Sequence, residues 1–129
     1  MSTGQKHILL VEDNLVATTV QKGILERLDC TVDCVDSGEK AIDLASKQIY
    51  DLILMDLGLP GIDGIEATKK IRAENIKEHP NHIVPIVAVT ANENEEEHDK
   101  CLKNGMSEVI CKPFTADKAK KVLSHYFKY

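Results

Sequence analysis

The chain has 129 residues, of which 43% are hydrophobic, so its length fits one ordinary domain with a single core and leaves no room for a second. Its formal net charge of -5 excludes the basic surface that grips nucleic acid or an anionic membrane, and favours a protein partner or a cation. The polar start does not lead into a secretory segment and the apolar runs are strand-sized, so we expect a cytoplasmic protein.

The first predicted strand, Ile8–Val11, is followed by a segment with helical spacing, Leu15–Leu28. Asn14 is the expected N-cap, because a short amide side chain there accepts hydrogen bonds from the free N–H groups of the first turn. The side chains expected to face the core recur four residues apart: Val16, Val20, Ile24 and Leu28. The pattern predicts one strand and one amphipathic helix.

The rest of the chain alternates in the same way. Further strands are predicted at Thr31–Val35, Leu52–Met55, Ile83–Val89 and Val109–Cys111. Further helices are predicted from 38 to 48 after Ser37, from 64 to about Ile76, from Glu93 to a left-handed cap at Gly105, and after the N-cap Thr115. Strict alternation predicts an α/β fold, a parallel sheet with helices on both faces, because each parallel crossover needs a helix-length connection.

Polar side chains follow four of the five predicted strands. They are Glu12 and Asp13 after the first strand, Asp56 after the third, Thr90 after the fourth and Lys112 after the fifth. Ligand sites of such sheets lie at the carboxyl ends of the strands, so we expect these groups to converge. Carboxylates this close repel one another unless a cation lies among them, and hard oxygen ligands suit Mg²⁺. The sequence therefore predicts a magnesium site.

Each of these residues has a plainer explanation when taken alone. An acidic pair after a strand is usually a solvated loop that caps the next helix, and Asp56 before a Pro–Gly turn suits a turn former. Thr90 and Lys112 are equally ordinary as a β-branched strand end and a surface charge. One such residue at each of four strand ends is much harder to explain by independent accidents.

The chain resembles the receiver domains of response regulators, over nearly its whole length from about 7 to 126. The resemblance rests on the pair Glu12–Asp13, the segment Asp56–Gly64, the pair Thr90–Ala91 and the segment Lys112–Phe114, all in order and suitably spaced. It implies one receiver domain over residues 1–129. The implied fold is a flavodoxin-like (βα)5 doubly wound sandwich, with a five-stranded parallel sheet of order 2-1-3-4-5.

The resemblance also implies roles for matching residues. Asp56 would accept the phosphoryl group, attacking a phosphohistidine on a histidine kinase domain or a histidine phosphotransfer protein. Asp13 and Asp56 would bind Mg²⁺ directly together with the backbone carbonyl of Gly58, and Glu12 would act through a bound water. The isolated domain would then be no conventional enzyme, because it catalyses only its own phosphorylation and dephosphorylation.

Two further positions bind the phosphoryl group in the family. Lys112 would pair with one phosphoryl oxygen and Thr90 would hydrogen-bond another, and the Lys112–Pro113 bond is commonly cis. The family's switch couples the hydroxyl to an aromatic residue three positions before the lysine, which is Val109 here. Because Val109 has no ring to rotate, the resemblance favours phosphoryl shuttling over a large change of an output surface.

The segment 104–109 and the run Thr90–Asn92 look most like receivers fused to hybrid sensor histidine kinases. The chain ends at Tyr129, directly after the last predicted helix. We therefore expect either the receiver part of a hybrid kinase, on the cytoplasmic side of the membrane, or a stand-alone response regulator, and we favour the first. The oligomeric state is not predicted.

Other classes of protein function fit these residues less well. A phosphatase of the haloacid dehalogenase type needs a second Asp two residues after the nucleophile, where Gly58 stands. A flavin-binding protein would need a phosphate loop after the first strand, where Glu12–Asp13 would repel a phosphate. A degenerate, interaction-only receiver is the remaining alternative, although the expected acceptor and lysine are both present.

The histidines and cysteines predict no second site. His79 and His82 flank Pro80 and Asn81 in what reads as a polar loop, and no other ligand pair in register supports zinc. The cysteines lack C-x-x-C spacing, and we expect ordinary reduced thiols at all four: Cys30, Cys34, Cys101 and Cys111.

Overall fold

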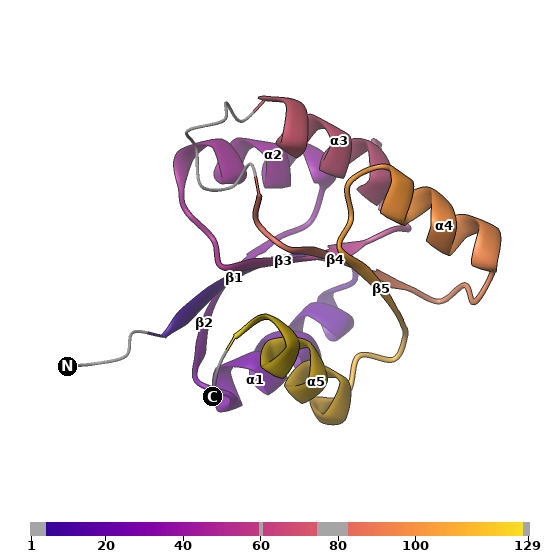
Figure 1. The fold of residues 1–129 in the computed structure, drawn as a ribbon. Helices are drawn as coiled ribbons and strands as arrows, with labels where there is room; N and C mark the ends of the chain where they lie inside the picture. Colours follow the sequence, from indigo (N-terminus) through magenta and orange to yellow (C-terminus); the bar gives the residue numbers. More distant parts are fainter. Residues whose placement is uncertain (1–4, 60, 75–82, 128–129) are drawn as a thin grey trace.

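The computed structural model describes residues 5–59, 61–74 and 83–127, and strands alternate with helices throughout (Figure 1). The strands are β1 (Lys6–Val11), β2 (Cys30–Val35), β3 (Leu52–Asp56), β4 (Ile86–Thr90) and β5 (Glu108–Cys111). The helices are α1 (Leu15–Arg27), α2 (Gly38–Lys47), α3 (Gly64–Glu74), α4 (Glu95–Lys103) and α5 (Ala116–Tyr126). The predicted α/β alternation is confirmed.

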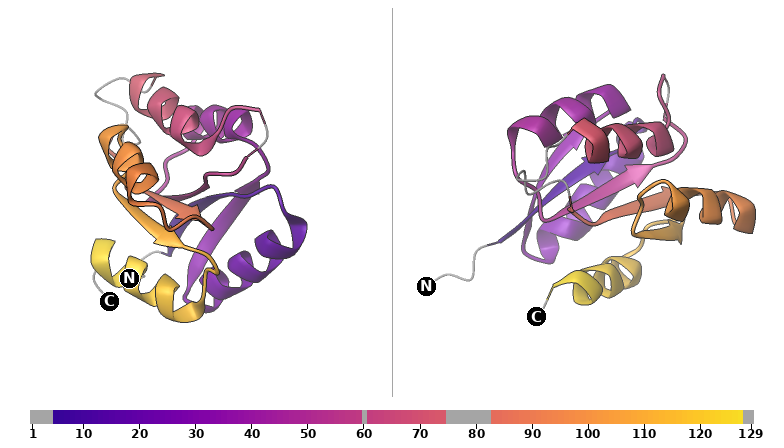
Figure 2. Two further views of the ribbon diagram at one scale, coloured as in Figure 1. Left: turned by 90° about the vertical axis from the view of Figure 1, so that its right-hand side faces the viewer. Right: turned by 45° about the horizontal axis from the view of Figure 1, so that its top comes forward.

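The five strands form one parallel sheet of order β2-β1-β3-β4-β5, which confirms the predicted flavodoxin-like topology. Helices α1 and α5 cover one face of the sheet, and α2, α3 and α4 cover the other (Figures 1 and 2). Because all strands run in one direction, their carboxyl ends meet at a single edge. This edge carries the residues that the sequence singled out.

Two apolar clusters fill the space between the sheet and its helices. Leu9 and Val11 of β1 point into the cluster under α2, α3 and α4, whereas Ile8 and Leu10 point into the cluster over α1 and α5. Every residue of β3 and β4 is buried. Burial on both faces explains why these strands read as continuous apolar runs.

Side chains that cap the helices fix where most of them begin. Three predicted start signals are confirmed as N-caps whose side chains accept a backbone N–H three residues on: Asn14, Ser37 and Thr115. Helix α4 begins at Glu95, two residues after the predicted start at Glu93, because the side chain of Asn94 caps it. The position of the N-cap Asn94, and not that of the first acidic residue, therefore determines where the helix begins.

The predicted apolar stripe of α1 is wrong. The side chains of Val16 and Val20 are 74% and 53% exposed, whereas Leu25 is fully buried and Gln21 nearly so. Residues four apart advance about 40° around a helix per step, because one turn takes about 3.6 residues. A stripe of strict four-residue spacing therefore winds around the helix, and only its later members reach the core.

Strand β4 begins at Ile86 and not at Ile83, which is exposed. Pro85 lies between them and has no N–H to donate, so ladder pairing on its N–H side starts after it. The predicted end of α3 at Ile76, and the two histidines His79 and His82, lie outside the described residues. None of the helices in the described parts is long and apolar enough to cross a membrane. None of the four cysteines, all of which lie in the described residues, forms a disulfide.

The carboxyl end of α4 is tied to its neighbours. Gly105 has a φ of 105°, the left-handed region that the sequence predicted for this cap. The guanidinium of Arg72 on α3 donates two hydrogen bonds to the carbonyl of Gly105, at 3.1 and 2.8 Å. Ser107 exchanges hydrogen bonds with Ile86, its N–H donating to the Ile86 carbonyl and its hydroxyl accepting the Ile86 N–H.

The packing of α1 predicts unequal effects of two truncations. Leu25→Ala should lower the free energy of unfolding by about 2–5 kcal/mol, because it empties a buried site. Val16→Ala removes an exposed side chain and should change that free energy by about 0.5 kcal/mol or less. Urea denaturation of both variants checks this. If Val16→Ala lowered the free energy of unfolding as much as Leu25→Ala, Val16 would face the core as the sequence predicted.

Candidate functional site

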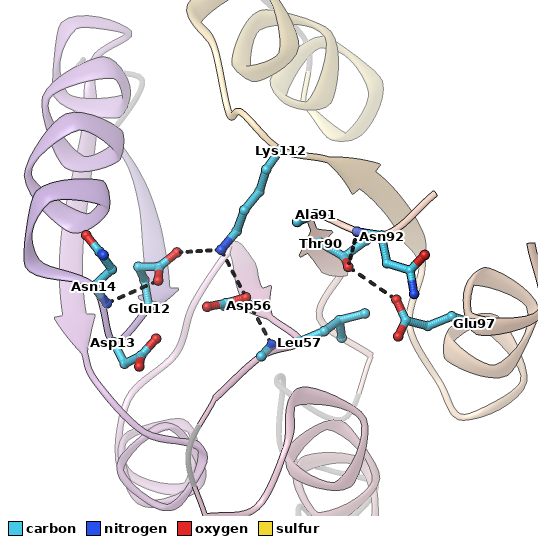
Figure 3. A pocket seen from close by; sticks show the side chains of 11 residues that line it. Glu12, Asp13, Asn14, Asp56, Leu57, Thr90, Ala91, Asn92, Glu97 and Lys112 are labelled. Atoms are coloured by element: carbon cyan, nitrogen blue, oxygen red, sulfur yellow. Dashed lines mark hydrogen bonds and ion pairs between the residues drawn. The ribbon is translucent and has the colours of Figure 1, made fainter. Parts of the chain in front are cut away.

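The carboxyl edge of the sheet holds a cavity of about 560 Å³ (Figure 3). All six residues predicted for the site line it: Glu12, Asp13, Asp56, Gly58, Thr90 and Lys112. Asn14, Asn92 and Glu97 line it as well. The structure therefore brings together residues from four strand ends, and adds the side chains of Asn14 and Glu97, which the sequence had given no place in the site.

The strand register places these side chains at the edge. Asp56 is the last residue of β3 and pairs with Val89, so it stands beside Thr90 at the end of β4. The backbone N–H of Lys112 donates to the carbonyl of Thr90 at 2.7 Å, which carries the lysine to the same edge. Behind Asp56, a Cβ on Gly64 would lie 2.6 Å from the Asp56 carbonyl oxygen, so only glycine fits there.

Three carboxylates lie close together in the cavity. One oxygen from each of Glu12, Asp13 and Asp56 lies within 4.8 Å of the others. Glu12 and Asp56 are buried and Asp13 is exposed. Burial raises the pKa of Glu12 above its ordinary value; the backbone N–H of Asn14 opposes this rise, and the charge of Asp56 adds to it. Three oxygen donors this close suit a hard divalent cation.

The ammonium of Lys112 bridges two of these carboxylates. Its Nζ lies 3.3 Å from Asp56 Oδ1 and 3.5 Å from Glu12 Oε1 (Figure 3). Burial disfavours the charged ammonium, but the charges of Asp56 and Glu12 outweigh burial, and the pKa of Lys112 is raised. Lys112 therefore stays protonated at neutral pH. The Lys112–Pro113 bond is cis, as expected.

Thr90 and Gly58 make local hydrogen bonds at the rim. The Thr90 hydroxyl donates to Glu97 Oε1 at 3.2 Å and accepts the N–H of Asn92 at 3.0 Å. The N–H of Gly58 donates to Asp56 Oδ1 at 3.1 Å, which helps to orient that carboxylate. The metal role of the Gly58 carbonyl stays a prediction.

Sequence reasoning missed Glu97, which lies within the helix predicted from Glu93 onward and was given no role in the site. A signal was present, because Glu97 is the third residue after the N-cap Asn94, a position whose side chain commonly reaches back past the start of the helix. The partner it reaches depends on how α4 lies beside β4, which the sequence pattern does not give.

A family model described as the response regulator receiver domain matches residues 8–124. The chain belongs to the response regulator receiver family. Receiver domains are the phosphoryl-accepting modules of two-component signalling, and the predicted class of function is confirmed.

Several curated relatives are signalling proteins that contain such a domain. The chain is 34% identical to Histidine kinase 5 of Arabidopsis thaliana, over 96% of the chain and 16% of that protein. It is 38% identical to Probable histidine kinase 1 of Oryza sativa subsp. indica, over 97% and 16%, and 36% identical to Transcription factor SKN7 of Saccharomyces cerevisiae, over 95% and 19%. The chain thus spans less than a fifth of the length of these relatives.

Solved structures agree with the fold and the family. The receiver domain of sensor histidine kinase PA1611 from Pseudomonas aeruginosa PAO1 is 40% identical, with a TM-score of 0.85 over 95% of this chain and 98% of that one. Its crystal structure has a magnesium ion coordinated in the active site cleft. Full-length ShkA in complex with AMPPNP is 38% identical, with a TM-score of 0.82 over 95% of this chain and 24% of that one.

Removal of the Lys112 ammonium should destabilise the protein in buffer with EDTA. Lys112→Met leaves Glu12 and Asp56 without a nearby cation, and we expect a loss of about 1–2 kcal/mol in the free energy of unfolding. This is less than the roughly 3–5 kcal/mol of a fully buried pair, because the lysine side chain is 32% exposed.

The matched control is Lys69→Met. Its ammonium lies 3.9 Å from Glu66 on the exposed surface of α3, where an ion pair contributes about 0–1 kcal/mol. Urea denaturation of both variants compares the two sites, and equal losses would show that Lys112 does not balance the carboxylates.

Proposed function

We propose that this domain accepts a phosphoryl group from a phosphohistidine onto Asp56 in a Mg²⁺-dependent reaction. The proposal rests on one observation, which is the set of charged groups that surround Asp56. Its buried carboxylate lies at the end of β3, with the Lys112 ammonium at 3.3 Å and two further carboxylates within 4.8 Å. A nucleophilic oxygen, a cation for the incoming oxygens and a metal-binding donor set thus share one cavity.

In the proposed reaction an Asp56 oxygen attacks phosphorus in line with the bond to the histidine nitrogen. The new P–O bond forms as the P–N bond breaks, and the imidazole leaves with the electron pair and takes up a proton. The product is an acyl phosphate on Asp56. Lys112, which already contacts Asp56, would pair with one phosphoryl oxygen, and the Thr90 hydroxyl would donate to another. Their contribution is positioning and electrostatic stabilisation.

Mg²⁺ is the proposed cofactor. Asp13 and Asp56 would hold it directly with the Gly58 carbonyl, and Glu12 would act through water. When bound, the ion offsets the negative charge of the carboxylates and of the transferring phosphoryl group. The oxygen donors of the cavity support this choice, as does the magnesium in the related PA1611 receiver.

We propose further that the domain is the receiver part of a hybrid sensor histidine kinase and acts in the cytoplasm. Its donor would be a histidine kinase domain or a histidine phosphotransfer protein. Support comes from the plant histidine kinases and from the PA1611 and ShkA structures. Receiver domains also occur in proteins such as SKN7, and a stand-alone response regulator is the alternative.

The exposed side of α1 is the proposed docking surface for the donor. Leu15, Val16 and Val20 are large apolar side chains that this helix leaves in solvent. Leu15 borders a hollow with Glu12 and Asp13, and Val20 borders another with Lys112. The apolar surface is therefore continuous with the site into which a donor must place its phosphohistidine.

The acceptor is tested by the intact mass of the protein after incubation with acetyl phosphate or phosphoramidate, with and without Mg²⁺. We expect one Mg²⁺-dependent phosphoryl adduct on the native chain and none on Asp56→Asn. Asp13→Asn should need a roughly tenfold higher Mg²⁺ concentration for half-maximal labelling, because it loses a ligand charge. Full labelling of Asp56→Asn would refute the acceptor, and no adduct on any variant would favour an interaction-only receiver.

Docking and chemistry are separated by the choice of donor. Val20→Asp should slow transfer from a phosphorylated histidine phosphotransfer protein by about tenfold or more, because it places a charge in an apolar contact. Labelling by acetyl phosphate should not change. The matched control is Ile49→Asp, a 59% exposed side chain that precedes β3 at the opposite edge of the sheet. Equal slowing by both substitutions would contradict docking on α1.

A further inference from the structure

The Thr90 hydroxyl can donate one hydrogen bond, and the structure shows which group accepts it. Thr90 Oγ1 donates to Glu97 Oε1 at 3.2 Å and accepts the N–H of Asn92 at 3.0 Å (Figure 3). A hydroxyl has a single O–H to donate. The bond to Glu97 and a bond to a phosphoryl oxygen on Asp56 therefore exclude each other.

The Glu97 carboxylate can accept the hydrogen bond of the Thr90 hydroxyl because other groups cap the start of its helix. A glutamate at the third position of a helix commonly accepts the N–H of the N-cap residue. Here the N–H of the N-cap Asn94 donates to the side chain of Asn92 at 2.8 Å, and the Asn94 side chain accepts the N–H groups of Glu96 and Glu97. Helix α4 thus begins without help from the Glu97 carboxylate, which points back toward β4.

The charge of Glu97 also bears on the site. Its side chain lines the same cavity as Asp56 and Lys112. Among the described residues, no lysine, arginine or histidine forms an ion pair with it, so the hydroxyl of Thr90 is the donor that offsets its charge. A phosphoryl group on Asp56 would take that hydroxyl and add negative charge to the cavity. Both effects act against the present position of Glu97.

From this competition we propose that Glu97 is a positioning residue. It holds the Thr90 hydroxyl until a phosphoryl group on Asp56 takes that hydroxyl. Loss of the Thr90–Glu97 hydrogen bond then releases the first turn of α4. The inference rests on the proposed function, because it requires a phosphoryl group at Asp56. It supplies a link from the acceptor to α4 that needs no aromatic side chain at Val109. That valine packs into the cluster between the sheet and α2, α3 and α4.

The first test measures the affinity for beryllofluoride, which mimics a phosphoryl group on a carboxylate, at saturating Mg²⁺. Glu97→Ala should bind it about three- to tenfold more tightly than the native chain, because no hydrogen bond to Thr90 must be broken. Glu96→Ala is the matched control: it removes the same charge from the neighbouring residue of the same helix, and should change the affinity less than about twofold.

The same pair is then measured with Thr90→Val, which keeps the shape of the side chain and removes the hydroxyl. The gain from Glu97→Ala should disappear in this background, because the two residues act through one hydrogen bond. An equal gain with and without the hydroxyl, or one no larger than that of Glu96→Ala, would overturn the proposal. A native chain that gives neither an adduct on Asp56 nor beryllofluoride binding would instead refute the proposed function itself.

Amide hydrogen exchange tests the link to α4. In the native chain, beryllofluoride should speed exchange in the first turn of α4, where the Thr90–Glu97 bond is lost. In Glu97→Ala, exchange there should already be fast before the ligand is added, whereas Glu96→Ala should behave like the native chain. Unchanged exchange in α4 of the native chain would overturn the proposed release.

Discussion

Parallel pairing of the strands is the constraint on which this structure depends. Because every strand runs the same way, residues at or just after the carboxyl ends of β1, β3, β4 and β5 meet at one edge although they lie up to about 100 positions apart in the sequence. Three carboxylates meet there, and the low-dielectric core beneath them makes their repulsion costly. The ammonium of Lys112 balances two of them, so the edge carries a charge arrangement that an incoming cation or phosphoryl group can change.

Much of this could be predicted from local patterns. The site residues directly follow apolar runs, and their convergence comes from strand direction alone, so the sequence predicted Glu12, Asp13, Asp56, Thr90 and Lys112 together. The N-caps at Asn14, Ser37 and Thr115 were equally predictable, because a cap bonds to N–H groups of its own first turn. These features need only the chain's immediate neighbourhood and the alternation of strands with helices.

The errors and omissions concern contacts between elements. The stripe of α1 failed because spacing alone does not say which side of a helix meets the sheet, and Val16 and Val20 face solvent while Gln21 and Leu25 are buried. Glu97 was missed because its partner is set by the position of α4 beside β4. The sequence showed only that a ring is lacking at Val109. The structure adds the hydrogen bond that connects Thr90 to the neighbouring helix without such a ring.

The hydrogen bonds at the carboxyl end of α4 limit how this helix can move. Arg72 holds the carbonyl of Gly105, and Ser107 is paired with Ile86 on the sheet. The one buried residue of α4, Cys101, lies in the same half of the helix. The opposite end is exposed and joined to the sheet through Thr90 and Glu97. A helix fixed at one end pivots about that end, so release at Glu97 would become a swing of the acidic first turn, with its largest displacement at the solvent-exposed start of the helix.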